Sequence, residues 1–82
     1  MSQPVTADTV RADAARHLGI GPERLTADLL LAEDLNLDSL AGMELSMSLE
    51  ERYSISITDD ELELVTTYGE LEQLVLGKVS GR

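Results

Sequence analysis

The sequence predicts an all-α fold: a small antiparallel four-helix bundle of three main helices and one short helix, with a long loop between the first two helices. Four segments carry helical spacing of apolar residues or helix-capping residues, whereas the one alternating segment, residues 54–57, has no second strand with which to pair. The 82 residues suit one domain, whose ordered part we expect to span about residues 6–77. Because the chain has no cysteine and only two aromatic residues, aliphatic side chains must fill its core.

The first helix is expected to begin between Thr6 and Asp8, either of which can cap it, and to end at Leu18. Gly19 follows, at the position where a left-handed residue commonly closes a helix. The loop from residue 19 to residue 38 shows no sustained period, so we expect a short helical turn within it and leucines that hold it against the core. Asn36 lies in a tight part of this loop and tolerates a positive φ.

The second helix is expected to span residues 39–53, with Asp38 as its N-cap. A helical wheel places its apolar residues in two arcs. Leu45, Leu49 and Tyr53 form one arc, which is expected to face the core. The second arc consists of Leu40, Met43 and Met47 among glutamates, and we interpret it as an exposed surface for a partner. The alternative is a helix that is buried on two sides.

After an extended connection at residues 54–57, Thr58 and Glu61 have the spacing of a capping box and predict a short helix that ends near Val65. Thr67 and Glu70 repeat that spacing before a last helix, which is expected to end at Gly77 and to leave a frayed polar tail.

The net charge of −10 argues against a nucleic-acid partner, because phosphates require basic side chains. Residues 33–63 hold ten carboxylates against a single cation, Arg52. Such a field favours a basic protein partner, although a solvated acidic face would look the same. The chain shows no targeting segment and no apolar run of membrane-spanning length, so a cytoplasmic location without membrane association is expected.

Hydrolytic catalysis at Ser39 is not expected, because no general base accompanies it and the only histidine, His17, lies in the first helix. Asp34, Asn36 and Asp38 match the first half of an EF-hand loop. The second half is missing, since Ser39 replaces the glycine and Leu45 replaces the bidentate glutamate. We therefore expect no catalytic residue and no dedicated metal site.

Several motifs together resemble the acyl carrier protein family. The motifs are Leu31-Ala-Glu-Asp-Leu-Asn-Leu-Asp-Ser-Leu followed by an acidic helix, then Ile57-Thr-Asp-Asp-Glu, Val65-Thr-Thr-Tyr and His17-Leu-Gly-Ile. The resemblance covers nearly the whole chain. It implies that Ser39 is esterified by 4′-phosphopantetheine from coenzyme A in a Mg²⁺-dependent phosphopantetheinyl transferase, and that the thiol of this arm carries acyl groups as thioesters.

The resemblance also implies which residues basic partner surfaces would read, namely Asp38, Leu40, Met43, Glu44, Met47, Glu50 and Glu51. The partners would be the transferase, a ketosynthase, an acyltransferase or ligase, and tailoring enzymes of polyketide, antibiotic or related secondary-metabolite, or fatty acid biosynthesis. The carrier itself is expected to be a free-standing monomer.

The chain departs from the common family pattern at several positions. Asn36 stands where glycine is common, Ala41 replaces a frequently acidic residue, and Thr58 replaces a common proline. Gly42 and Ser46 lie on the presumed core arc, where larger apolar residues are usual. We interpret these two as widening or polarising a pocket beside the arm, and the alternative is close packing by a neighbouring helix.

Two other functions stay open. A non-covalent acidic adaptor would use the arc of Leu40, Met43 and Met47 and leave Ser39 unmodified. A divalent-cation-binding protein would use the acidic stretch around Asp34 and Asp38.

Overall fold

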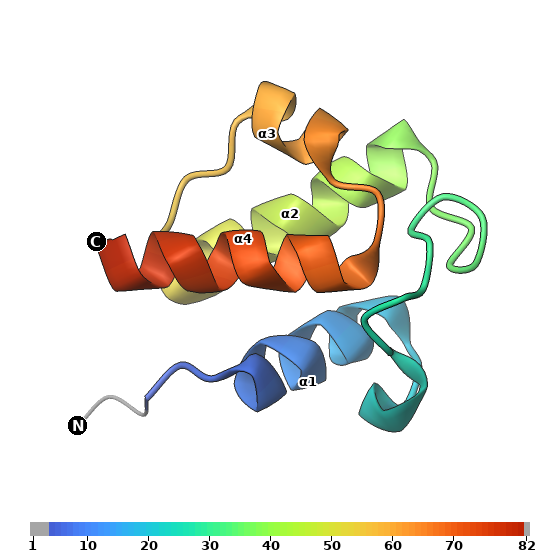
Figure 1. Cartoon of the computed structure of the whole chain (residues 1–82), viewed down its shortest axis with the longest axis horizontal. Helices are drawn as coiled ribbons and strands as arrows, with labels where there is room; N and C mark the ends of the chain where they lie inside the picture. The colour runs from blue at the N-terminus through green and yellow to red at the C-terminus, as the bar shows by residue number, and fades with distance from the viewer. Residues whose placement is uncertain (1–3, 82) are drawn as a thin grey trace.

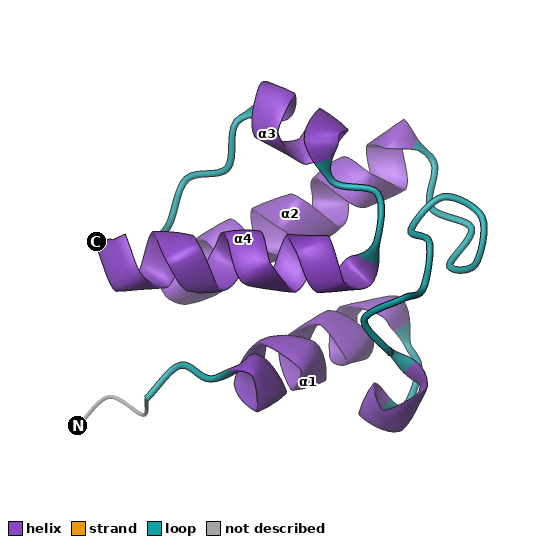
Figure 2. Ribbon diagram, in the orientation of Figure 1, coloured by secondary structure: helices purple, strands orange, loops and turns teal. Residues whose placement is uncertain are grey.

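The computed structural model describes residues 4–81 and confirms the all-α prediction for them (Figures 1 and 2). The elements in this part of the chain are α1 (Ala7–Leu18), the 3₁₀ turn η1 (Pro22–Arg24), α2 (Ser39–Tyr53), α3 (Asp59–Leu64) and α4 (Tyr68–Gly81). Helix α1 runs in the opposite direction to α2 and α4 (Figure 1). The short α3 lies near α2, on the side away from α1 (Figure 1). Within residues 4–81, no helix is both long and apolar enough to span a bilayer.

Side-chain caps determine where the helices begin. Thr6, not Asp8, is the N-cap of α1, and its hydroxyl accepts from the amide of Thr9. Thr58 and Glu61 form the predicted capping box of α3. Thr67 and Glu70 exchange the same two bonds at the start of α4, at 3.0 and 3.2 Å. These interactions satisfy amide groups that the first helical turn would otherwise leave without partners.

The core is built from aliphatic residues and the two tyrosines. One face of each long helix supplies it, and the loop adds Leu25; the fully buried large side chains are Val10, Leu25, Leu45, Leu49, Tyr68, Leu71 and Val75. Tyr53 is also buried. The predicted inner arc of α2 therefore does face the core.

Two polar networks join α1 to the other long helices. Buried Glu72 of α4 accepts from the Arg11 guanidinium at 3.2 Å and from the Tyr68 hydroxyl at 2.9 Å. Burial and the Glu72 carboxylate raise the pKa of the Tyr68 hydroxyl above its usual range. On the α2 side, the Tyr53 hydroxyl donates to the carboxylate of Asp13. Burial is the larger cause and this hydrogen bond the second cause that raise the pKa of Tyr53 to about 12. Both phenols thus remain protonated donors at neutral pH.

The loop between α1 and α2 contains the predicted helical turn and is held by its leucines, as expected, but also by backbone hydrogen bonds. The amide of Leu31 donates to the carbonyl of Thr66 at 3.0 Å. The amides of Tyr68 and Gly69 donate to the carbonyls of Leu29 and Ala27, each at 2.9 Å. We call these bonds between residues 27–31 and residues 66–69 the loop contact. It fixes the loop beside the start of α4, and Asn36 has the expected positive φ of 58°.

The loop contact requires a glycine at position 69. A Cβ built on Gly69 would lie 2.8 Å from the Cβ of Ala27 and 2.9 Å from its carbonyl oxygen. These separations are shorter than any side chain tolerates, and one of the two atoms belongs to the backbone. The loop can approach α4 this closely only because position 69 has no side chain.

The prediction that the last helix ends at Gly77 is wrong, because α4 continues to Gly81. Gly77 does not adopt a left-handed conformation, so it does not end the helix. Leu76 and Val79 pack against the core, and Lys78 pairs with Glu61 of α3 at 2.8 Å. These contacts keep the last turns helical. Arg82, the end of the expected polar tail, lies outside the described residues.

Gly69→Ala is expected to destabilise the protein by about 1–3 kcal/mol, because the added methyl group forces the loop away from α4. Urea denaturation measures this change. Gly77→Ala is the matched control: nothing lies within 4 Å of its Cβ position, so alanine should stabilise α4 by about 0.5–1 kcal/mol. Equal effects of the two substitutions would contradict the steric role of Gly69.

Candidate functional site

Ser39 is the first residue of α2 and is exposed. The carboxylate of Asp38 accepts from the amide of Ala41 at 2.8 Å, which fixes the helix start as predicted. At this position the helix dipole presents its positive end. A hydroxyl placed here is accessible to another protein and can carry an anionic group such as a phosphate at low electrostatic cost.

The serine has no activating partner in the described part of the chain. Its hydroxyl forms no hydrogen bond to any residue between 4 and 81, and His17 is exposed in the last turn of α1. A nucleophilic serine requires a base within hydrogen-bond reach. The arrangement therefore suits a serine that another protein modifies.

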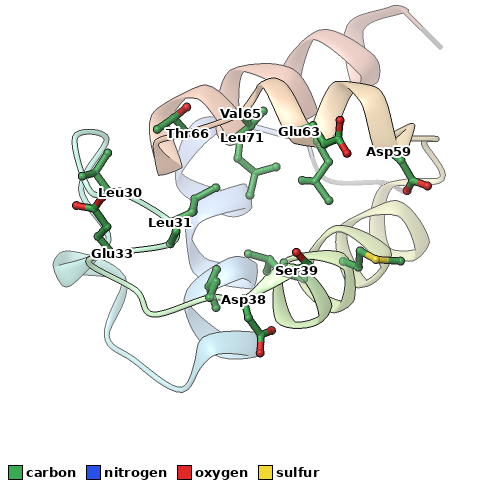
Figure 3. A pocket seen from close by; sticks show the side chains of 16 residues that line it. Leu30, Leu31, Glu33, Asp38, Ser39, Asp59, Glu63, Val65, Thr66 and Leu71 are labelled. Atoms are coloured by element: carbon green, nitrogen blue, oxygen red, sulfur yellow. The ribbon is translucent and has the colours of Figure 1, made fainter.

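A cavity of about 460 Å³ opens beside Ser39 (Figure 3). Residues from α2, α3, the start of α4, the loop before α2 and the α3–α4 connection surround it. Most of its lining is apolar: Leu30, Leu31, Ala32, Leu37, Met43, Leu45, Leu62, Val65 and Leu71. Four acidic residues, Glu33, Asp38, Asp59 and Glu63, also line it, and no basic residue does. The cavity can therefore receive an apolar group attached near Ser39.

Gly42 and Ser46, the two unusual residues of α2, have different environments. Gly42 lines the cavity, and no atom lies within 4 Å of the position that its Cβ would take. The alternative of close packing by a neighbouring helix is therefore wrong at Gly42. Ser46 does not line the cavity; it is buried, and its hydroxyl donates to the carbonyl of Met43 at 2.9 Å. The prediction that Ser46 polarises the pocket is thus wrong, because its own helix satisfies the hydroxyl.

The second arc of α2 is exposed, as predicted. Leu40, Met43 and Met47 keep 65%, 42% and 57% of their surface accessible. The alternative of a helix buried on two sides is therefore wrong. Leu64 at the end of α3 is 80% exposed, which the sequence did not predict.

The acidic residues of this face fall into two groups. Glu44 and Glu51 are exposed, and their carboxylates form no hydrogen bond or ion pair with the described residues. Asp38 and Glu50 already have internal roles, since Asp38 caps α2 and Glu50 accepts from the amide of Ile57 at 3.0 Å. Glu44 and Glu51 are thus free to meet cations of a partner, whereas Asp38 and Glu50 also stabilise the fold.

Four of the basic side chains in the described residues, those of Arg11, Arg16, Arg52 and Lys78, pair with acids away from Ser39. Arg52, the one cation of the acidic stretch, lies 3.3 Å from Asp13 of α1, and Arg16 lies 3.5 Å from the same carboxylate. Arg11 pairs with Glu72, between α1 and α4. The negative field around Ser39 is consequently not neutralised by the protein itself.

The half EF-hand motif has a structural role. The carboxylate of Asp34 accepts from the amide of Leu30 at 2.8 Å, and that of Asp38 accepts from Ala41. Within residues 4–81, no three acidic, histidine or cysteine side chains converge at distances that would hold a metal ion. Caps in the loop and at the start of α2 account for Asp34 and Asp38, and Asn36 lies between them with a positive φ.

Sequence reasoning placed Ser39 and the exposed arc of α2, but it missed the opposite side of the cavity. That side comes from Leu30 and Leu31 in the loop and from Asp59, Leu62 and Glu63 in α3. The irregular leucines of the loop were the only sequence feature that pointed to it. Their direction depends on the loop contact, which has no local pattern.

Comparison with known proteins gives consistent matches. A family model described as "Phosphopantetheine attachment site" matches residues 8–75. The acyl carrier protein of Thermosynechococcus vestitus is 36% identical over 80 residues, which cover 98% of this chain and 99% of that protein. The acyl carrier protein of Chlamydia trachomatis serovar L2 is 41% identical over 64 residues, or 78% of this chain and 83% of that protein, and the serovar A protein matches with the same values.

The ion pair of Lys78 with Glu61 holds α3, one side of the cavity, against α4. The Lys78 ammonium and the amide of Thr58 lower the pKa of Glu61 to about 2. Because the folded pKa is depressed, the stabilisation is complete above the ordinary pKa near 4.5 and is lost as the pH falls towards 2.

Lys78→Met is therefore expected to raise the pKa of Glu61 towards its ordinary value, as measured by NMR titration of the carboxyl carbon. The variant should be less stable than the wild type at pH 6, and the difference should shrink between pH 5 and pH 2. Arg24→Met, which removes a cation from the exposed η1 turn, is the control and should leave the Glu61 pKa unchanged. An unchanged pKa in Lys78→Met would show that the ion pair does not form in solution.

Proposed function

The chain belongs to the acyl carrier protein family, whose cofactor is covalently attached 4′-phosphopantetheine, and we propose that Ser39 is the residue that carries this arm. When attached, the arm supplies a terminal thiol that holds acyl groups as thioesters. The single observation that supports Ser39 most directly is its placement, since it is an exposed serine at the first position of α2 and also lines the apolar cavity.

The surroundings of Ser39 fit a phosphodiester-linked group. The positive end of the α2 dipole stabilises the added negative charge, and the Asp38 side chain is turned to the Ala41 amide. Asp38, Glu33 and Glu63 line the same cavity as Ser39, and the serine remains exposed. Ser39 is thus the substrate of a phosphopantetheinyl transferase, which supplies the base and the Mg²⁺ for the transfer.

The partner surface consists of the exposed arc of α2 and its free carboxylates. Leu40, Met43 and Met47 supply apolar contact area, and Glu44 and Glu51 attract basic groups. A transferase, a ketosynthase, an acyltransferase or ligase, and tailoring enzymes with basic docking surfaces fit this surface. Charge attraction would accelerate their encounter with the carrier, and salt would weaken it.

We assign the cargo to polyketide or related secondary-metabolite biosynthesis, with fatty acid biosynthesis as the second candidate. Gly42 leaves the cavity open beside Ser39, and carboxylates of Glu33, Asp59 and Glu63 line it together with leucines. A mixed lining of this kind suits an acyl chain that carries polar groups near its attachment point.

A non-covalent adaptor is the second candidate function, because the arc of Leu40, Met43 and Met47 is exposed whether or not Ser39 is modified. Modification itself separates the two functions.

Incubation with coenzyme A, Mg²⁺ and a broad-specificity phosphopantetheinyl transferase is expected to add one phosphopantetheine to the wild type, as measured by intact mass. Ser39→Ala should gain no mass, because the hydroxyl that accepts the phosphate is gone. Ser48→Ala, a serine-to-alanine change within the same helix, is the matched control and should be modified like the wild type. No mass gain with several such transferases would favour the adaptor.

Charge reversal of the two free carboxylates, Glu44→Lys with Glu51→Lys, is expected to lower kcat/KM for the transferase by about tenfold at low salt. The difference should shrink as the salt concentration rises, because screening removes the attraction from the wild type. Glu23→Lys, with its exposed carboxylate on the η1 turn, is the control and is compared per reversed carboxylate, because it reverses one carboxylate and the double variant reverses two. An equal loss per reversed carboxylate in Glu23→Lys would mean that total charge matters and the surface does not.

A further inference from the structure

We propose that Gly42 is the portal through which the arm on Ser39 and its cargo enter the cavity between α2 and α3, and that the missing side chain sets the width of the cargo admitted. The inference rests on the proposed attachment at Ser39. It concerns which residue of this chain controls access, a role that neither the family match nor the attachment site assigns.

Gly42 lies one helical turn after Ser39, the residue that would carry the arm. Residues three apart on a helix lie on the same face, about 5–6 Å apart at Cβ, so Gly42 is next to Ser39 along the cavity side of α2. Both residues line the cavity. A group that starts at Ser39 and turns into the cavity along α2 therefore meets position 42 first.

The space in front of Gly42 is empty. A Cβ at this position would have no atom within 4 Å, apart from its own helix. By contrast, a Cβ at Gly69 would collide with Ala27, so that glycine is explained by packing. Gly42 also has no left-handed backbone conformation that would require glycine. Neither backbone geometry nor a packing contact accounts for the residue.

Gly77 shows whether a helical glycine with free space around it is informative by itself. Gly77 also lies inside a helix with nothing within 4 Å of its Cβ position, but it is exposed on α4 and does not line the cavity. Glycine in a helix is therefore not evidence of function in this chain. Gly42 differs from Gly77 because it lines the cavity one helical turn after Ser39.

The opposite side of the portal is α3. Asp59, Leu62 and Glu63 line the cavity from this helix, and Figure 3 shows Asp59 and Glu63 on the α3 side, across from Ser39. The two carboxylates disfavour an anionic group on the cargo, because charge repulsion would add to the cost of desolvation. The deeper leucines favour an uncharged, apolar acyl body.

The absence of a side chain at position 42 sets the width of the acyl group that can enter the cavity. A leucine at position 42 would project into the space beside Ser39 and cover the path to Leu31 and Leu62. An alanine would narrow this space by one methyl group. Entry of the acyl group into the cavity should therefore become harder in the order glycine, alanine, leucine. A branched acyl group should be affected more than a linear one.

The experiment uses the full-length protein loaded on its arm with an octanoyl thioester. Loading is checked by intact mass, and release by hydroxylamine is compared with that of octanoyl-coenzyme A. The wild type should release the acyl group several-fold more slowly than octanoyl-coenzyme A, because the cavity shelters the chain. Gly42→Leu should approach the rate of octanoyl-coenzyme A, and Gly42→Ala should lie between them.

A second readout is independent of the reaction with hydroxylamine. Methyl resonances of Leu31, Leu62 and Val65 should shift when the wild type is loaded with octanoate and should remain at their unloaded positions in Gly42→Leu. Gly77→Leu is the matched control and should behave like the wild type in both assays. Because position 42 has free space and leucine favours helices, Gly42→Leu should have a urea midpoint at least equal to that of the wild type.

Each outcome decides the inference. Equal release rates and equal methyl shifts in wild type and Gly42→Leu would overturn the portal, as would a wild type that releases its cargo as fast as octanoyl-coenzyme A. If the transferase fails to load the wild type at all, the proposed attachment at Ser39 is refuted, and the portal is refuted with it. Loading of every variant with no effect at position 42 would leave the attachment standing and refute the portal alone.

Discussion

The loop contact is the interaction on which the site depends. Its hydrogen bonds join residues 27–31 to residues 66–69, and they form only because Gly69 lets the backbone of Ala27 approach α4 closely. The same bonds place Leu30 and Leu31 beside the cavity, opposite α2. A small helical domain has little surplus core, so the fixed position of a twenty-residue loop contributes directly to the shape of the site.

Charge is distributed so that the acidic face survives in a stable fold. Three ion pairs join helices, namely Arg52 with Asp13 between α1 and α2, Arg11 with Glu72 between α1 and α4, and Lys78 with Glu61 between α3 and α4. The remaining carboxylates repel one another, and they do so where they face solvent and partners. The buried tyrosine hydroxyls complete two of these networks, so the few polar groups inside the bundle have hydrogen-bond partners.

Much of the site could be predicted because it lies on one helix. The positions of Ser39 and the exposed arc follow from a cap at Asp38 and a period of 3.6 residues, both of which are local. Ser46 shows where this reasoning fails. The wheel placed it correctly on the buried arc, but the wheel could not show that its hydroxyl turns back to the carbonyl of Met43, away from the cavity.

The sequence by itself determined the helices, the N-terminal caps of all but the first helix, the acidic face and the family, because each depends on residues close together in the chain. Only the tertiary structure decided that α4 continues past Gly77, that Leu64 is exposed, and that Gly42 opens onto a cavity. These three outcomes depend on contacts between distant segments, whose energies no local period records. The serine and its acidic neighbours could therefore be recognised from the sequence, whereas the space beside them could be seen only in the folded chain.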